Sequence, residues 1–211
     1  MSYSSASIAV HGPTLTLRPP TGADAPALLD LASDPEVTRW FSWGPYTRVD
    51  EPRAYIERLA GERERGEQLD LLIVHREHGT AGITGLSEFS ARDRRCMVGT
   101  WFGRRFWGTG ANEESKALMA HLAFVVLGLG RLGAYSNIHN GRSTQALLAV
   151  GFRHEGVLRE WHRHGDRAFD VNVFGLLRDE WADGPLADVP VTVEGAPPAA
   201  FARGGDAAVG C

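Results

Sequence analysis

The feature that most limits the fold is one change of hydrophobic period in the middle of the chain. Apolar residues alternate at every second position in residues 69–75, 80–88 and 96–102, with a turn at residues 77–79. From Asn112 onward the spacing is helical, with apolar side chains at Leu118, Leu122, Val125, Val126 and Leu129. Alternation predicts strands, whereas a spacing of three and four residues predicts a helix. We therefore expect an antiparallel meander followed by a long amphipathic helix over residues 112–129.

Shorter elements surround this central part. We expect a strand at residues 14–18, a helix capped by Asp24, and a helix from Asp50 that Gly66 ends. After the long helix come a strand at residues 132–137, a helix at residues 143–150, and a hairpin of residues 152–162 and 168–177. The predicted organisation is an N-terminal extension at residues 1–13, one α/β domain at residues 14–182, and a Gly/Ala-rich tail at residues 183–211, expected to be disordered.

Composition excludes several classes of function. The 211 residues carry a formal net charge of -4 with 43% hydrophobic residues, so the chain is neither globally disordered nor basic enough to bind nucleic acid or an anionic membrane through its overall charge. The two cysteines, Cys96 and Cys211, form neither a disulfide framework nor a metal spacing. No histidine pattern indicates a metal site. With no secretion signal at the N-terminus, a cytoplasmic location is expected.

A glycine turn between strand and helix is the strongest chemical signal. Gly108 and Gly110 stand directly before the predicted long helix, where unpaired backbone N–H groups and the helix dipole favour an anion. Arg104 and Arg105 precede the turn and add positive charge, which suits a pyrophosphate. The turn lacks the third glycine of the dinucleotide-binding motif and the Gly-Lys-Ser/Thr end of a nucleotide P-loop. An ordinary helix start with turn glycines remains the simpler alternative for such a short pattern.

The surrounding motifs resemble those of the Gcn5-related N-acetyltransferases. Arg105-x-x-Gly108-x-Gly110 is similar to their acyl-CoA pyrophosphate loop, and Asn140-x-x-Ser143 followed by Gly151-Phe152 is similar to a second signature of that superfamily. The strings at residues 155–160 and 176–181 resemble the ribosomal-protein N-terminal acetyltransferase branch (RimJ/RimL-like). The resemblance implies a mixed, mostly antiparallel sheet flanked by helices, in which the fourth and fifth strands, residues 96–102 and 132–137, splay apart to admit acetyl-CoA.

The same resemblance implies a set of donor-binding residues. They form the strand end, the glycine turn, the start of the long helix and the Asn140 motif: Trp101, Phe102, Arg104, Arg105, Gly108, Thr109, Gly110, Ala111, Asn112, Asn140 and Ser143. Asn140 would contact the CoA arm, or would simply cap the following helix.

Catalytic residues are less well defined. Relatives often carry a glutamate as general base where this chain has Met97, and Glu88 on the preceding strand is the nearest replacement. Glu155, Glu160 and His139 are weaker candidates, and a water relay without a single base is a further alternative. Ser143 is the expected proton donor to the departing thiolate, a role compatible with capping its helix. Cys96, in a strand, is expected to be a packed thiol and not a nucleophile.

The expected function is direct transfer of acetyl from acetyl-CoA to a primary amine, either a protein N-terminus or a small molecule. Trp40, Trp43 and Tyr46 in an aromatic segment, and Trp161 on the hairpin, are expected to wall the acceptor site, although rings of this kind also pack in cores. The acidic net charge favours a cationic acceptor. An inactive CoA-binding or peptide-binding module on the same fold is the alternative. The sequence leaves the longer acyl donors and the oligomeric state, a homodimer included, open.

Overall fold

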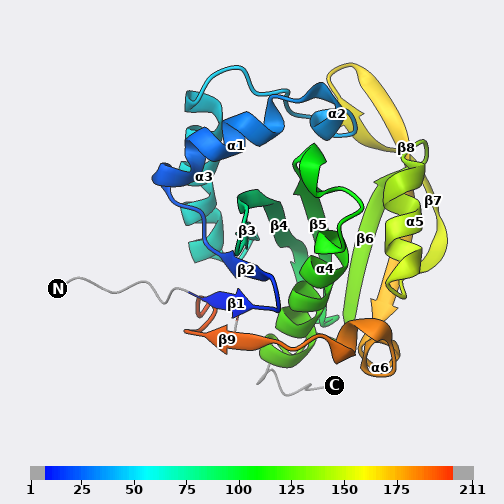
Figure 1. The fold of residues 1–211 in the computed structure, drawn as a ribbon. Coiled ribbons are helices and arrows are strands. Elements are labelled where there is room, and N and C mark those ends of the chain that lie inside the picture. The colour runs from blue at the N-terminus through cyan, green and yellow to red at the C-terminus, as the bar shows by residue number, and fades with distance from the viewer. Residues whose placement is uncertain (1–7, 202–211) are drawn as a thin grey trace.

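A computed structural model describes residues 8–201, which form a nine-stranded sheet with helices on both faces (Figure 1). The strand order is β7-β8-β6-β5-β4-β3-β2-β1-β9. The strands are β1 (Ala9–His11), β2 (Leu15–Arg18), β3 (Leu69–His75), β4 (Gly79–Ser90), β5 (Arg95–Phe102), β6 (Arg131–Asn137), β7 (Arg153–His164), β8 (Arg167–Leu177) and β9 (Thr192–Glu194). The helices are α1 (Ala25–Ala32), α2 (Pro35–Thr38), α3 (Asp50–Arg65), α4 (Ala111–His121), α5 (Gly141–Ala149) and α6 (Arg178–Ala182).

The sheet divides at β5 and β6. These two strands are parallel and pair at only three positions, from Arg95↔Arg131 to Met97↔Gly133. Every other neighbouring pair is antiparallel. Beyond Met97 the backbone of β5 has no ladder partner on the side of β6, so the two strands diverge. The expected mixed, mostly antiparallel sheet with two splayed strands is confirmed.

Two layers of helices cover the sheet. Helices α1 and α3 contact β4 and β3 on one face, while α4 and α5 contact β5, β6 and β7 on the other (Figure 1). Side chains alternate accordingly along the strands. Leu69, Leu71 and Ile73 join the main core with α4, whereas Leu72 joins the smaller core under α1 and α3. The Asp70 side chain therefore lies on the α1 and α3 face.

The long helix differs from its prediction in one respect. Helix α4 ends at His121, and a π-helical turn at Leu122–Val126 follows, closed by the bond from Leu127 N to Leu122 O at 2.9 Å. A π turn inserts one extra residue, which rotates the residues after it around the axis. Phe124 consequently fills the core, while Val125, expected on the apolar side, is 49% exposed.

The C-terminal segment is ordered as far as it is described, so the expected disordered tail is wrong for residues 184–201. Strand β9 pairs with β1, and both extend the sheet beyond the predicted domain of residues 14–182. Leu186 and Phe201 are buried, and the Phe201 ring lies 4.8 Å from that of Phe89. A few apolar anchors and an open sheet edge suffice to order a segment of otherwise small residues. Residues 1–7 and 202–211, Cys211 among them, lie outside the described residues.

Within residues 8–201, none of the helices combines the length and the apolar character needed to cross a membrane.

Candidate active site

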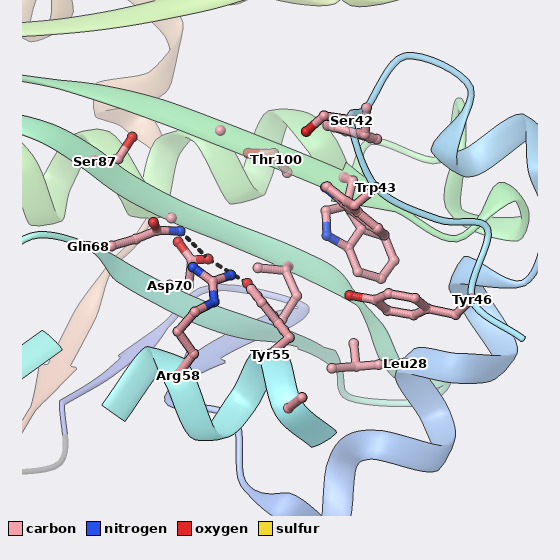
Figure 2. A pocket seen from close by; sticks show the side chains of 16 residues that line it. Leu28, Ser42, Trp43, Tyr46, Tyr55, Arg58, Gln68, Asp70, Ser87 and Thr100 are labelled. Atoms are coloured by element: carbon pink, nitrogen blue, oxygen red, sulfur yellow. Dashed lines mark hydrogen bonds between the residues drawn. The ribbon is translucent and has the colours of Figure 1, made fainter. Parts of the chain in front are cut away.

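Two cavities, each of about 630 Å³, lie on opposite sides of β5. The first, here called the splay groove, opens where β5 and β6 diverge and is lined from α4, α5, both strands and the β7-β8 hairpin. The second, here called the aromatic pocket, lies between the sheet and the α1 and α3 side (Figure 2). Both are lined by Phe41, Ser42, Gly99, Thr100 and Trp101. A group held in one cavity is therefore next to a group held in the other.

The glycine turn lies at the mouth of the splay groove. Gly108 and Gly110 have φ angles of 73° and 87°, which L side chains rarely adopt, and a methyl group on either would meet no atom within 4 Å. Both glycines and Asn112 line the groove. Because Gly110 is the N-cap of α4, the first N–H groups of that helix have no intrahelical acceptor. The turn thus forms a cradle of backbone N–H groups open to the groove, a geometry that suits an anion.

Most residues expected to bind the donor do line the splay groove. These are Trp101, Phe102, Gly108, Gly110, Asn112, Asn140 and Ser143. Thr109 and Ala111 belong to the turn but not to the lining. The Thr109 hydroxyl donates to Phe106 O at 2.9 Å, and Ala111 is buried.

The two expected arginines point elsewhere. Arg104 Nη2 donates to Asp34 Oδ1 at 2.7 Å, and Arg105 Nη2 donates to the carbonyl of Thr80 at 3.3 Å. Neither lines the groove. Two other arginines do line it, Arg142 and Arg163, and the guanidinium carbon of Arg142 lies 3.2 Å from the centre of the Trp107 ring. Burial lowers the pKa of Arg142. Arg142 lies within the Asn140-x-x-Ser143 motif, and that position is the sequence feature that could have identified it as a groove residue.

The motif around Asn140 starts α5. Asn140 is the N-cap, and its Oδ1 accepts from Ser143 N at 3.2 Å. Of the two capping roles left open, Asn140 fills the cap, because Ser143 is the third residue of α5 and its backbone N–H is the donor. Its side chain is left to line the groove.

Lys116 is a groove residue that the sequence pattern did not single out. It lies on α4, is 4% exposed, and its Nζ donates to Thr100 Oγ1 at 2.5 Å. The Thr100 hydroxyl is in turn 2.8 Å from that of Thr84. None of the ion pairs within residues 8–201 includes Lys116. Burial without a counter-ion lowers the pKa of Lys116 to about 7. Lys116 is the only lysine in the sequence, and this is the one sequence feature that distinguishes it.

Glu88 lies at the edge of this region. Ser87 pairs with Met97, so Glu88 is adjacent to Met97 as expected, in a bulge with φ of 51°. It lines neither cavity, but Glu88 Oε2 accepts from Tyr135 Oη at 3.3 Å. Tyr135 does line the groove, and burial together with Glu88 raises its pKa. Tyr135 was missed because one aromatic residue in a buried strand carries no distinctive pattern.

The aromatic residues divide between the cavities. Trp43 and Tyr46 line the aromatic pocket, whereas Trp40 and Trp161 line the splay groove. The Trp43 ring lies 5.6 Å from that of Trp101 and 5.2 Å from that of Tyr46. None of the four expected rings is buried in a core. Two of the four rings that the resemblance implies for the acceptor site, Trp43 and Tyr46, therefore line the aromatic pocket.

Cys96 belongs to β5, its side chain is buried in the main core, and burial raises the pKa of its thiol to about 12. The expected packed thiol is confirmed, and a raised pKa disfavours the reactive thiolate form. In the part of the chain that the structure describes, no group of three or more metal-ligating side chains gathers.

Comparison with known proteins assigns this arrangement to a family. The family described as Acetyltransferase (GNAT) domain matches residues 14–153. The uncharacterized N-acetyltransferase p20 of Bacillus licheniformis is 31% identical over 80% of this chain and 95% of its own length. The crystal structure of a T. thermophilus protein described as an acetyltransferase is 33% identical and superposes with a TM-score of 0.73, covering 83% of this chain and 92% of that one. The microcin C7 self-immunity acetyltransferase MccE, solved with acetyl-CoA and AMP, shares the fold at 20% identity and a TM-score of 0.71, over 78% of this chain and 93% of its own.

Proposed function

The chain belongs to the GNAT acetyltransferase family, and we propose that it moves an acetyl group from acetyl-CoA directly to a primary amine. One observation carries the proposal: an anion cradle opens into a groove that meets a second pocket across β5. The first cavity suits the donor and the second suits the acceptor. Direct transfer needs the two substrates side by side, and the shared lining at residues 99–101 allows this.

The residues of the splay groove fit acetyl-CoA. The N-terminus of α4 and the glycine turn offer backbone donors to the pyrophosphate, and Arg142 adds a charge beside them. The edge of β5 beyond Met97 has unpaired backbone groups that suit the amides of the pantetheine arm. MccE, on the same fold, was solved with acetyl-CoA. The donor supplies the activated acetyl group, and the protein supplies position and protons.

Proton transfer is assigned to side chains along the groove. The acceptor must lose a proton before it attacks, and the departing thiolate must gain one. Ser143 and Lys116 line the groove and hold protons that the thiolate can take. Because the pKa of Lys116 is about 7, it exchanges a proton readily near neutral pH. Glu88 acts through Tyr135. The Tyr135 hydroxyl donates a hydrogen bond to Glu88, and the Tyr135 side chain lines the groove.

The experiment is a thiol-release assay with acetyl-CoA and a panel of amines and peptides. Release that depends on both substrates, together with a mass increase of the acceptor, supports the proposal. Tight CoA binding without release on any acceptor would instead identify a binding module that has lost the chemistry.

A further inference from the structure

Asp70 and two glycines on the neighbouring strands line the floor of the aromatic pocket. Asp70 pairs with Gly85, and Gly85 pairs with Gly99, so the three form one row over β3, β4 and β5. Residues directly opposite each other in neighbouring antiparallel strands point to the same face. The row therefore presents a single side chain, that of Asp70, to the pocket.

The carboxylate of Asp70 lies over Gly85 and is directed along this row. A methyl group at Gly85 would come within 1.8 Å of Asp70 Oδ1, so this oxygen occupies the space above the glycine. A methyl group at Gly99 would meet no atom within 4 Å. The path from the carboxylate to β5 is open.

Only one oxygen of the carboxylate is engaged. Oδ2 accepts from Tyr55 Oη and, at 2.7 Å, from Gln68 Nε2, and Figure 2 shows both bonds at the end of the pocket away from Trp43 and Tyr46. Within residues 8–201, Oδ1 has no hydrogen-bond partner. Burial raises the pKa of Asp70. A partly desolvated carboxylate with a free oxygen is a site for a cation.

The other charges near Asp70 leave the site negative. Arg58, on α3, is the cationic side chain among the pocket residues, and its Nη1 lies 2.6 Å from Glu62 Oε1. Arg58 is therefore already paired, and its side chain is 58% exposed. Asp70 and Glu62 share the one guanidinium of Arg58, so this end of the pocket carries one net negative charge, while the opposite end has Trp43, Tyr46 and Trp101.

We propose that the acceptor is a small diamine, whose second ammonium binds Asp70 Oδ1 while its reacting amine lies at β5 beside Trp101. The inference rests on the proposed acetyl transfer and names the acceptor class for that same site. Gly85 and Gly99 make room for the methylene chain, and Leu28 and Ile83 line its path.

Strand spacing sets the length of the diamine. Neighbouring strands lie about 4.8 Å apart, so Asp70 and Gly99 are separated by roughly 10 Å of sheet. The carboxylate reaches part of this distance. A chain of about four to six carbons between the two nitrogens spans the remainder.

The test compares diamines with monoamines of matched length in the wild type and in Asp70→Asn. The probes are 1,4-diaminobutane and 1,5-diaminopentane against butylamine and pentylamine, with kcat/KM from thiol release. The wild type should prefer diamines by about tenfold or more, and Asp70→Asn should bring the ratio of diamine to monoamine kcat/KM to within about threefold of one. Calorimetric binding of 1,4-diaminobutane, without acetyl-CoA, should weaken by the same factor.

Three controls separate the role of the Asp70 charge from loss of any other negative charge, from loss of a hydrogen bond to Asp70 and from misfolding. Glu57→Gln removes one exposed negative charge from the same helix as Tyr55 and should keep the preference. Tyr55→Phe keeps the carboxylate and removes one donor to it, so its effect should be smaller than that of Asp70→Asn. An unchanged melting temperature on Asp70→Asn, or a higher one, excludes misfolding.

The outcomes are distinct. Equal rates with monoamines and diamines, or a preference that survives Asp70→Asn, overturn the diamine inference and leave acetyl transfer standing. A clear preference for peptides over every diamine also overturns it. If no amine releases CoA and 1,4-diaminobutane does not bind, both this inference and the proposed function fail.

Discussion

Replacing Lys116 with methionine should stabilise the protein. Lys116 is buried with one hydrogen bond, to Thr100, and has no anionic partner within the described chain. A pKa lowered from 10.5 to about 7 corresponds to about 5 kcal/mol of unfavourable free energy when the amine is charged in the folded state, at about 1.4 kcal/mol per pH unit. Methionine has a similar shape and needs no solvation. At pH 6.5 the variant should gain about 4 kcal/mol of unfolding free energy.

The stability difference between the wild type and the methionine variant should also depend on pH. A lysine whose pKa is lower in the folded protein than in the unfolded chain binds fewer protons when folded, so wild-type stability rises with pH from about 7 toward 10.5. The variant lacks this titration. The stability gap between them should therefore narrow by about 2–3 kcal/mol from pH 6.5 to pH 9.

Urea unfolding at the two pH values measures this gap, with the slope of each transition as a check on two-state behaviour. The same variant should release CoA more slowly at saturating substrate, because a proton source is lost. A variant that is less stable than the wild type, or a gap that stays constant with pH, would refute the view of Lys116 as a desolvated, unpaired cation.

Three further perturbations test other parts of the molecule. Gly110→Trp should abolish CoA binding measured by calorimetry. Gly128→Trp is the control: Gly128 has a similar φ of 66° but lies outside the groove, so this variant should strain the backbone equally and keep CoA binding. Glu88→Gln should lower kcat, and Tyr135→Phe should lower it by a similar factor, because the two act as one hydrogen-bonded pair; an unaltered kcat in both would remove the Glu88–Tyr135 pair from proton transfer. Phe201→Ala should lower the free energy of unfolding by about 3 kcal/mol, since the ring is buried against Phe89, whereas no change would mean that residues 184–201 do not pack as described.

The sequence was sufficient for the elements that local pattern determines. Alternation located β3, β4 and β5, and glycine placement located the turn before α4, because strand pleat and glycine conformation depend on neighbouring residues. The π-helical turn was not predictable, because the apolar spacing of residues 112–129 is also that of an uninterrupted α-helix. The one inserted residue of the π turn rotates Val125 outward. The order of residues 184–201 depends on pairing with β1, which is remote in sequence.

The site shows the same division. The glycine turn, Asn140 and Ser143 line the groove as expected, because each occupies a fixed place at a helix start. Arg104 was assigned to the groove from its proximity in sequence, but Asp34 from a distant loop binds its guanidinium. Asp70 was missed because its importance comes from two glycines on neighbouring strands, and only strand register brings them into one row.

The most direct test of the central claim is CoA release from acetyl-CoA in the presence of primary amines, with the acceptor product weighed by mass spectrometry. The account predicts release that requires both substrates, one acetyl group on the amine, and loss of the reaction in Gly110→Trp but not in Gly128→Trp. Release that proceeds equally without an amine, or that survives Gly110→Trp, would contradict it.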